Sequence, residues 1–297
     1  MMSLKVQIPF WICTLIWGTT WIVILGQLGT VPPSWSVTYR FLTAGAVMFA
    51  YAKFTGAPLR IGRDGQIFAI IFGAAQFVFN FNFVYRAEAH ITSGLVAVIF
   101  ALLIVPNTVF ARIFLGTRPS PRFYLGSGIA IAGIGLLFLK EYRAAAAGSD
   151  AVLLGIGLTL CGIISASVAN IMQATKRAKA LPIASLLAWG MLWGTLFNAL
   201  LAWATVGPPV IEPSFTYVGG VLYLGIAASA IAFMAYFNVI RMIGPGPAAY
   251  SSVIVPVIAM LISTIFEGYH WTLLAGAGGV LTMAGLVIAL TARRPST

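Results

Sequence analysis

Residues 91–112 read ITSGLVAVIFALLIVPNTVFAR, an apolar run whose only charged residue is the closing Arg112. A helix needs about 20 mostly apolar residues to cross roughly 30 Å of hydrocarbon. The run also lacks the alternation of apolar and polar residues that is typical of a strand in a membrane barrel. Because backbone amides in lipid need internal hydrogen-bond partners, we expect this run to form a transmembrane helix.

The composition extends this expectation to the whole chain of 297 residues. Sixty per cent of the residues are hydrophobic, 8% are charged, and the mean hydropathy is +0.99. Soluble domains carry roughly 25% charged residues, so most of the surface of this chain must face lipid. We predict an all-α integral membrane protein with ten transmembrane helices. The predicted spans are residues 9–27, 35–53, 66–86, 91–112, 122–140, 151–174, 182–205, 215–240, 246–267 and 271–291.

Lysine and arginine lie in short clusters between these spans, which indicates a topology signal and argues against a nucleic-acid partner. With a cytoplasmic N-terminus, most of the 17 basic residues fall in cytoplasmic loops. We therefore predict that both termini are cytoplasmic and that the lipid bilayer is the main partner of the chain. These cytoplasmic basic residues are Lys5, Lys53, Arg60, Arg63, Arg112, Arg118, Arg122, Lys176, Arg177, Lys179, Arg241, Arg293 and Arg294.

The two halves of the chain, residues 9–140 and 151–291, repeat each other weakly. Each half contains five predicted spans, which is an odd number, so the second half is expected to enter the membrane upside down relative to the first. Inverted repeats of this kind are typical of secondary transporters. A shift of 152 residues pairs Gly73 with Gly225, Ala75 with Ala227 and Phe81 with Phe233, and a shift of 148 pairs Cys13 with Cys161 and Ile16 with Ile164.

Several motifs in these halves resemble those of a known family. They are Trp17-Gly18-Thr19-Thr20-Trp21, Arg40-Phe41, Phe114-Leu115-Gly116, and Pro256 followed by Phe266-Glu267-Gly268. In this order they are similar to the motifs of EamA domains in the drug/metabolite transporter superfamily, and the length and aromatic content look closest to YddG-like amino-acid exporters. The resemblance implies two five-helix EamA-like repeats, a central cavity, export of small metabolites and a place in the bacterial inner membrane. Ser165-Ala166 stands where the second half would repeat Trp17-Gly18.

Polar side chains inside spans are costly, so each one suggests a role. Gln76, Asn80 and Phe83 follow the spacing i, i+4 and i+7 in the third span, which places them on one face of a helix. Such a face offers amide groups to a substrate. The alternative is a structural hydrogen bond between helices, worth about 0.6–2 kcal/mol.

Four tryptophans form two pairs at i, i+4 spacing, Trp17 with Trp21 and Trp189 with Trp193. They are candidates for an aromatic cavity wall, and the alternative is an anchor at the membrane interface. Arg40 in the second span is a candidate ligand for a substrate carboxylate. The favoured alternative is that its side chain snorkels to the outer surface and caps neighbouring helix ends.

The sequence lacks the features of several functional classes. No Asp or Glu lies in the middle of a predicted span, so a cationic drug would find no opposite charge there. The Walker loop, His-Glu-x-x-His and Gly-x-Ser-x-Gly are missing from the sequence. Cys13 and Cys161 both fall inside spans, where neither a disulfide nor a metal site is expected. We therefore predict no catalytic residue, no metal and no cofactor, and we do not expect an enzyme.

Together these features predict a secondary transporter that exports small neutral metabolites by alternating access through a central cavity. Amino acids with hydrophobic or aromatic side chains are the leading substrate class. Nucleosides, sugars or lipophilic drugs are alternatives within the same fold, and a channel or a membrane enzyme acting on lipid is a more remote one. The driving force is left open between facilitated diffusion and proton coupling. A complete two-half unit in one chain permits a monomer.

Overall fold

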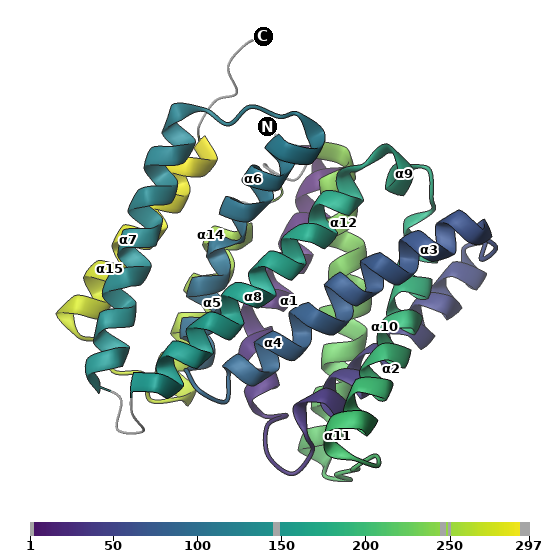
Figure 1. The fold of residues 1–297 in the computed structure, drawn as a ribbon, viewed down its shortest axis with the longest axis horizontal. Helices are drawn as coiled ribbons and strands as arrows, with labels where there is room; N and C mark the ends of the chain where they lie inside the picture. Colours follow the sequence, from purple (N-terminus) through teal and green to yellow (C-terminus); the bar gives the residue numbers. More distant parts are fainter. Residues whose placement is uncertain (1–2, 145–148, 244–247, 249–250, 292–297) are drawn as a thin grey trace.

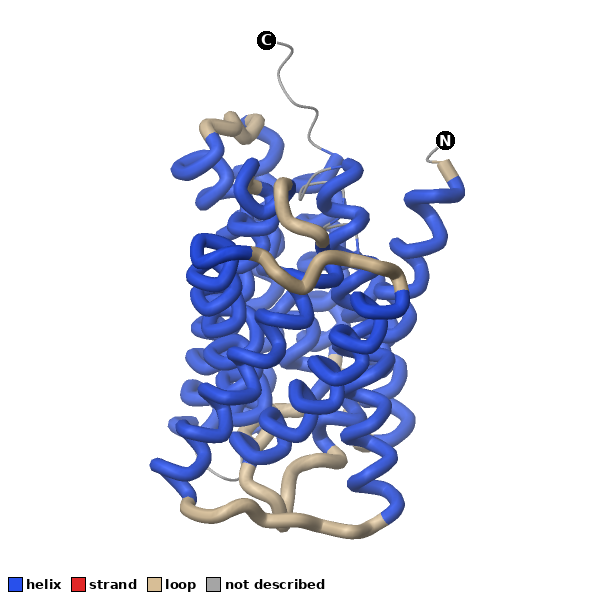
Figure 2. Tube along the Cα trace, turned by 90° about the vertical axis from the view of Figure 1, so that its right-hand side faces the viewer, coloured by secondary structure: helices blue, strands red, loops and turns tan. Residues whose placement is uncertain are grey.

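The fold is a bundle of helices, and the described residues contain no strand. The computed structural model describes residues 3–144, 149–243, 248 and 251–291. The helix axes are roughly aligned with one another, and the loops lie at the two ends of the bundle (Figure 2). The start of the first helix and the end of the last lie at the same end (Figure 1).

The helices of the first half are α1 (Leu4–Leu25), α2 (Pro33–Phe54), α3 (Gly62–Gly73), η1 (Ala74–Phe79), α4 (Asn80–Ala87), α5 (Ser93–Phe100), η2 (Ala101–Leu103), α6 (Ile104–Leu115) and α7 (Pro121–Ala144). Those of the second half are α8 (Ser149–Ala174), α9 (Lys176–Lys179), α10 (Ile183–Val206), α11 (Phe215–Leu222), η3 (Tyr223–Ile231), α12 (Ala232–Ile243), α14 (Ser251–Phe266) and α15 (Leu273–Thr291).

Local sequence signals set several of these ends. Pro33 and Pro121 stand at the first positions of α2 and α7, where the missing N–H of proline costs no helical hydrogen bond. The Ser214 hydroxyl accepts a hydrogen bond from the Tyr217 backbone N–H at 3.2 Å and so caps α11. At the end of α6, Gly116 adopts the left-handed conformation with a φ of 69°.

Helical structure occupies most of the described part of each of the ten segments predicted to span the membrane. The ninth segment was expected to begin at residue 246, and its first residues lie mostly outside the described ones. Among the described residues, six continuous helical runs are long and apolar enough to cross a membrane, and three further apolar helices are shorter. The all-helical membrane architecture is therefore confirmed, whereas the number of crossings remains a prediction.

The two most extensive helix–helix contacts are each made between a helix of the first half and a helix of the second half. Helix α2 packs along α10, and α7 packs along α15. In the second pair the backbones touch, because a Cβ added to Gly126 would overlap the backbone of Gly285 and Ala289. Small residues at such a crossing let two helices approach within van der Waals distance of their backbones, which drives association in lipid.

Two helical runs, one in each half of the chain, contain a π-helical segment at corresponding positions of the internal repeat. Segment η1 lies between α3 and α4, and η3 lies between α11 and α12. The shift of 152 residues carries η1 onto residues 226–231, which all fall inside η3. π-Helical turns are rare and occur frequently at functional sites. Neither segment contains a proline, and the sequence pattern did not predict them.

The α7–α15 contact yields a first prediction. Gly126→Ala places a methyl group against backbone atoms that cannot move aside, so we expect the melting temperature to fall by an amount equivalent to about 1–3 kcal/mol. Gly128→Ala is the matched control, because no atom lies within 4 Å of an added Cβ at that glycine of the same helix. Thermal melting of the purified variants measures both. Equal melting temperatures would contradict the close packing.

Candidate functional site

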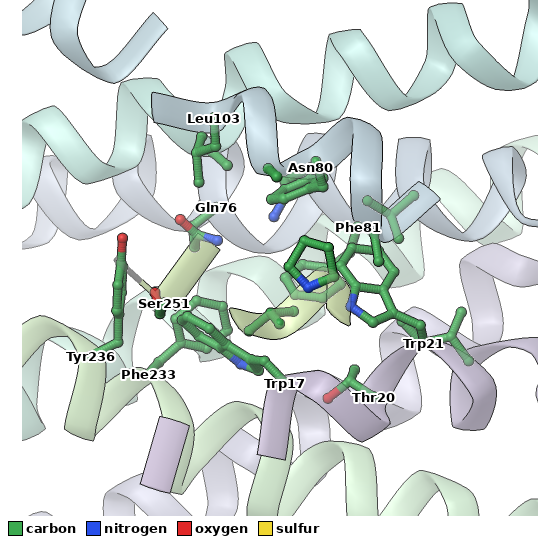
Figure 3. A pocket seen from close by; sticks show the side chains of 18 of the residues that line it. Trp17, Thr20, Trp21, Gln76, Asn80, Phe81, Leu103, Phe233, Tyr236 and Ser251 are labelled. Carbon is green, nitrogen blue, oxygen red and sulfur yellow. The ribbon is translucent and has the colours of Figure 1, made fainter. Parts of the chain in front are cut away.

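A cavity of about 110 Å³ lies between α1, α2, the η1–α4 run, the α5–η2 run, α8, α12 and α14. This volume holds several water molecules, since one needs roughly 10–15 Å³. In Figure 3, Gln76 and Asn80 lie on one side of the cavity, and Trp17 and Thr20 lie on the opposite side. Phe233, Tyr236 and Ser251 of the second half also line the cavity, so both halves of the chain contribute walls to one internal space.

Two buried amides line this cavity, and each has an oxygen atom without a hydrogen-bond partner among the described residues. Gln76 and Asn80 both line the cavity and are each 3% exposed. Neither the Gln76 Oε1 atom nor the Asn80 Oδ1 atom has a hydrogen-bond partner among the described residues. A buried acceptor without a partner costs about 1–3 kcal/mol. Both oxygens are therefore free to accept hydrogen bonds from a polar group that enters the cavity.

The structure brings Gln76 and Asn80 together as expected but turns Phe83 away from the cavity. The reason is η1, in which the Asn80 backbone N–H reaches the Ala75 carbonyl five residues back. A π-helical turn contains an extra residue, so the face of the helix beyond it advances by one position. Phe81 and Val84 consequently line the cavity, and Phe83 is half-buried outside it.

Aromatic rings form another wall of the cavity. Trp17 makes edge contacts with Phe233 and Tyr236, with ring centroids 5.3 and 4.8 Å apart, and Trp21 lies 5.6 Å from Phe100. The Trp21 Nε1 atom is buried without a partner among the described residues. Such a wall offers a large apolar surface and an N–H donor to a ligand.

The side chain of Arg40 lines the cavity and does not snorkel to the surface, contrary to the favoured expectation. It is 1% exposed. Its Nε atom donates a hydrogen bond to the Ser229 hydroxyl at 2.9 Å, and its Nη1 atom makes a long contact of 3.5 Å with the Tyr85 hydroxyl. The guanidinium also lies 4.3 Å from the centroid of the Phe81 ring. These partners hold the cation inside the bundle, where it can bind an anionic group.

Glu88 is a buried acid near this cation. It directly follows the apolar run Gly62–Ala87. Burial raises the pKa of its carboxyl well above the ordinary value, the nearby Glu267 carboxylate raises it further, and the Arg40 guanidinium lowers it. Glu88 therefore keeps its proton to a higher pH than an exposed glutamate.

The second tryptophan pair lies elsewhere. The Nε1 atom of Trp189 donates to the Leu59 carbonyl at 2.8 Å, and that of Trp193 donates to Gln66 Oε1 at 2.9 Å. Neither tryptophan lines the cavity. Trp189 joins α10 to the loop between α2 and α3, and Trp193 joins α10 to α3 itself. Their N–H groups are occupied, so they have the geometry of structural contacts between helices.

Sequence reasoning missed several residues of the cavity wall, although one signal pointed to two of them. Phe233 and Tyr236 both line the cavity. The shift of 152 residues pairs Phe81 with Phe233 and Val84 with Tyr236, and all four residues are lining residues. Applying the repeat to the first-half face would therefore have found the second-half wall. Among the described residues, no three His, Cys, Asp or Glu side chains are grouped to hold a metal ion.

Comparison with known proteins identifies relatives along the whole chain. The model of the EamA-like transporter family matches residues 8–139 and again residues 153–291. Protein PagO of Salmonella typhimurium is 24% identical, over 91% of this chain and 87% of its own length. The uncharacterized inner membrane transporter YedA of Escherichia coli is 26% identical, over 93% of this chain and 88% of its own.

Two further matches are informative. A probable terminal-alkyne amino-acid exporter of Streptantibioticus cattleyicolor is 26% identical, over 68% of this chain and 65% of its own. A solved crystal structure with 18% identity covers the whole of both chains with a TM-score of 0.74, which shows the same fold. These matches confirm the family that the motifs predicted, and they make the chain a multi-pass protein of the bacterial inner membrane. The chain belongs to the EamA-like transporter family.

Proposed function

We propose that this transporter exports amino acids with hydrophobic or aromatic side chains by alternating access through the central cavity. The observation that carries the proposal is the lining of the cavity. It combines a buried guanidinium, two amide oxygens without partners and an aromatic wall, and it includes no carboxylate among the described residues. A zwitterion with an apolar side chain matches this set of groups.

Each part of such a substrate finds a counterpart. The carboxylate pairs with Arg40, and hydrogen bonds to charged groups are worth about 1.5–3 kcal/mol. The ammonium group donates to Gln76 Oε1 and Asn80 Oδ1. The side chain packs against the rings of Trp17 and Phe233. A cationic drug meets the repulsion of Arg40, and a sugar leaves the aromatic wall without an apolar partner.

The proposed mechanism follows from the pairing of the halves. Helix α1 contacts α12 and α14, and α8 contacts α4 and the α5–α6 run, so each half packs its first helix against the other half in the same way. We propose ten crossings with both termini in the cytoplasm, two inverted five-helix repeats, and a relative movement of these repeats that opens the cavity to each side in turn. Within the family, nucleosides, sugars and lipophilic drugs are the competing substrates.

The substrate class can be tested by thermal stabilisation of the purified protein. Phenylalanine, its methyl ester, phenylpropionate and uridine are added separately. We expect phenylalanine to raise the melting temperature most, since the ester lacks the carboxylate and phenylpropionate lacks the ammonium group. A ligand at 100 times its Kd stabilises by about 2.7 kcal/mol. Stabilisation by uridine without stabilisation by phenylalanine would favour the nucleoside alternative.

The role of Arg40 can be tested by the ratio of two dissociation constants, that of phenylalanine and that of its methyl ester. This ratio does not depend on the stability of the folded protein. We expect the wild-type protein to bind phenylalanine about tenfold or more tightly than the methyl ester, because a charge-assisted hydrogen bond is worth at least about 1.4 kcal/mol. In Arg40→Gln this preference should disappear. Arg86→Gln is the control, since Arg86 donates to Ser34 at 3.2 Å and does not line the cavity. Isothermal titration measures both ratios. A preference that persists in Arg40→Gln would remove Arg40 from the site.

A further inference from the structure

Each of the two π-helical segments has a backbone carbonyl that accepts a side-chain hydrogen bond from the other half of the chain. The Ser165 hydroxyl of α8 donates to the Ala75 carbonyl of η1 at 2.8 Å. The Trp17 Nε1 atom of α1 donates to the Ala228 carbonyl of η3 at 3.1 Å. Both bonds join the first helix of one half to the irregular turn of the other.

These two bonds occupy corresponding places in the internal repeat. The shift of 148 residues that aligns the first helices pairs Trp17 with Ser165. The shift of 152 residues pairs Ala75 with Ala227, which is the residue next to Ala228. The same contact is therefore made twice, once with an indole N–H and once with a hydroxyl. Ser165 departs from the tryptophan of the first half and still keeps a hydrogen-bond donor at that place.

The acceptors lie where the π-helical turn alters the backbone. The Ala75 carbonyl already accepts the Asn80 backbone N–H, five residues ahead, in place of the residue four ahead that an α-helix would use. The Ser165 hydroxyl is a second donor to the same carbonyl, and it is fixed on a neighbouring helix. It therefore restricts the direction of the Ala75 carbonyl, and with it the backbone of the turn.

Each acceptor also directly precedes a polar side chain that either lines the cavity, as Gln76 does, or binds a lining residue, as Ser229 binds Arg40. Gln76 follows Ala75, and Asn80 is the residue whose backbone N–H reaches the same carbonyl. In the other half, Ser229 follows Ala228 and accepts the hydrogen bond from Arg40 Nε at 2.9 Å. The bond to Ala75 thus lies next to the Gln76 and Asn80 amides, and the bond to Ala228 lies next to Ser229, the partner of Arg40.

We infer that Ser165 is a positioning residue, whose hydroxyl holds η1 in the turn that directs the Gln76 and Asn80 amides into the cavity. Trp17 does the same for Ser229 and, through it, for Arg40. The inference rests on the proposed function for its effect on substrate. Ser165 is absent from the cavity lining, so its effect passes through η1. Without the bond, η1 relaxes toward an α-helix and the side chains beyond it rotate by about 100°.

The test compares Ser165→Ala with Ser165→Thr, which keeps the hydroxyl, and with Ser167→Ala. Ser167 lies on the same helix and is buried, and its hydroxyl has no partner among the described residues. We expect Ser165→Ala to weaken phenylalanine binding about tenfold, while the other two variants bind as the wild type does. In a background that carries both Gln76→Leu and Asn80→Leu, Ser165→Ala should weaken binding by less than about twofold, because both amides that it positions are already gone. Unchanged binding in Ser165→Ala, or an equally large effect of Ser165→Ala in that background, would overturn the inference.

A second measurement needs no substrate and so separates this inference from the proposed function. Hydrogen exchange of the backbone amides in residues 74–80 reports directly on the π-helical turn. We expect faster exchange in Ser165→Ala than in Ser167→Ala or Ser165→Thr. Equal exchange would show that the hydroxyl does not hold the turn. Faster exchange together with no binding of phenylalanine by the wild type would refute the proposed substrate and leave the positioning role intact.

Discussion

The need to satisfy every backbone N–H and C=O group without water governs this structure. In hydrocarbon each unsatisfied group costs several kcal/mol, so the chain can cross lipid only as helices. The same requirement limits how a helix can be irregular. Where η1 departs from the α-helical pattern, the Ala75 carbonyl bonds both to a later amide of its own segment and to the hydroxyl of Ser165.

The irregular turns also explain how an apolar bundle comes to contain a polar cavity. Gln76 lies within η1, and Asn80 begins the helix after it. In regular helices, buried amides pair with each other across the interface, as Asn82 does with Asn198 at 2.6 Å. The amides at η1 instead leave their oxygens unpaired beside an open space. A bundle stabilised elsewhere, by the tight α7–α15 and α2–α10 contacts, can tolerate this local cost.

The charged group of the cavity, the Arg40 guanidinium, also depends on partners inside the bundle. Arg40 is kept inside the bundle by the Ser229 hydroxyl and the face of the Phe81 ring, and neither partner neutralises it. A guanidinium held beside aromatic rings is what the proposed substrate, a carboxylate attached to an apolar group, requires. Ser229 belongs to η3 and Phe81 follows η1, so the position of the cation depends on both halves of the chain.

The fold class, the approximate helix positions and the family follow from the amino-acid sequence alone. Long apolar runs leave no other backbone solution in lipid, and motifs such as Trp17–Trp21 and the EamA-like endings are local in sequence. Of the residues predicted to bind substrate, Gln76, Asn80, Trp17, Trp21 and Arg40 line one cavity, and their binding role stays a prediction. Which face of each helix points inward depends on contacts between helices. Phe83 lies outside the cavity because a π-helical turn shifts the register by one residue, and Trp189 and Trp193 lie outside it, with their N–H groups bonded to acceptors distant in sequence. Arg40 stays inside for a related reason, since its partner Ser229 is supplied by the opposite half and helical periodicity carries no information about contacts between helices.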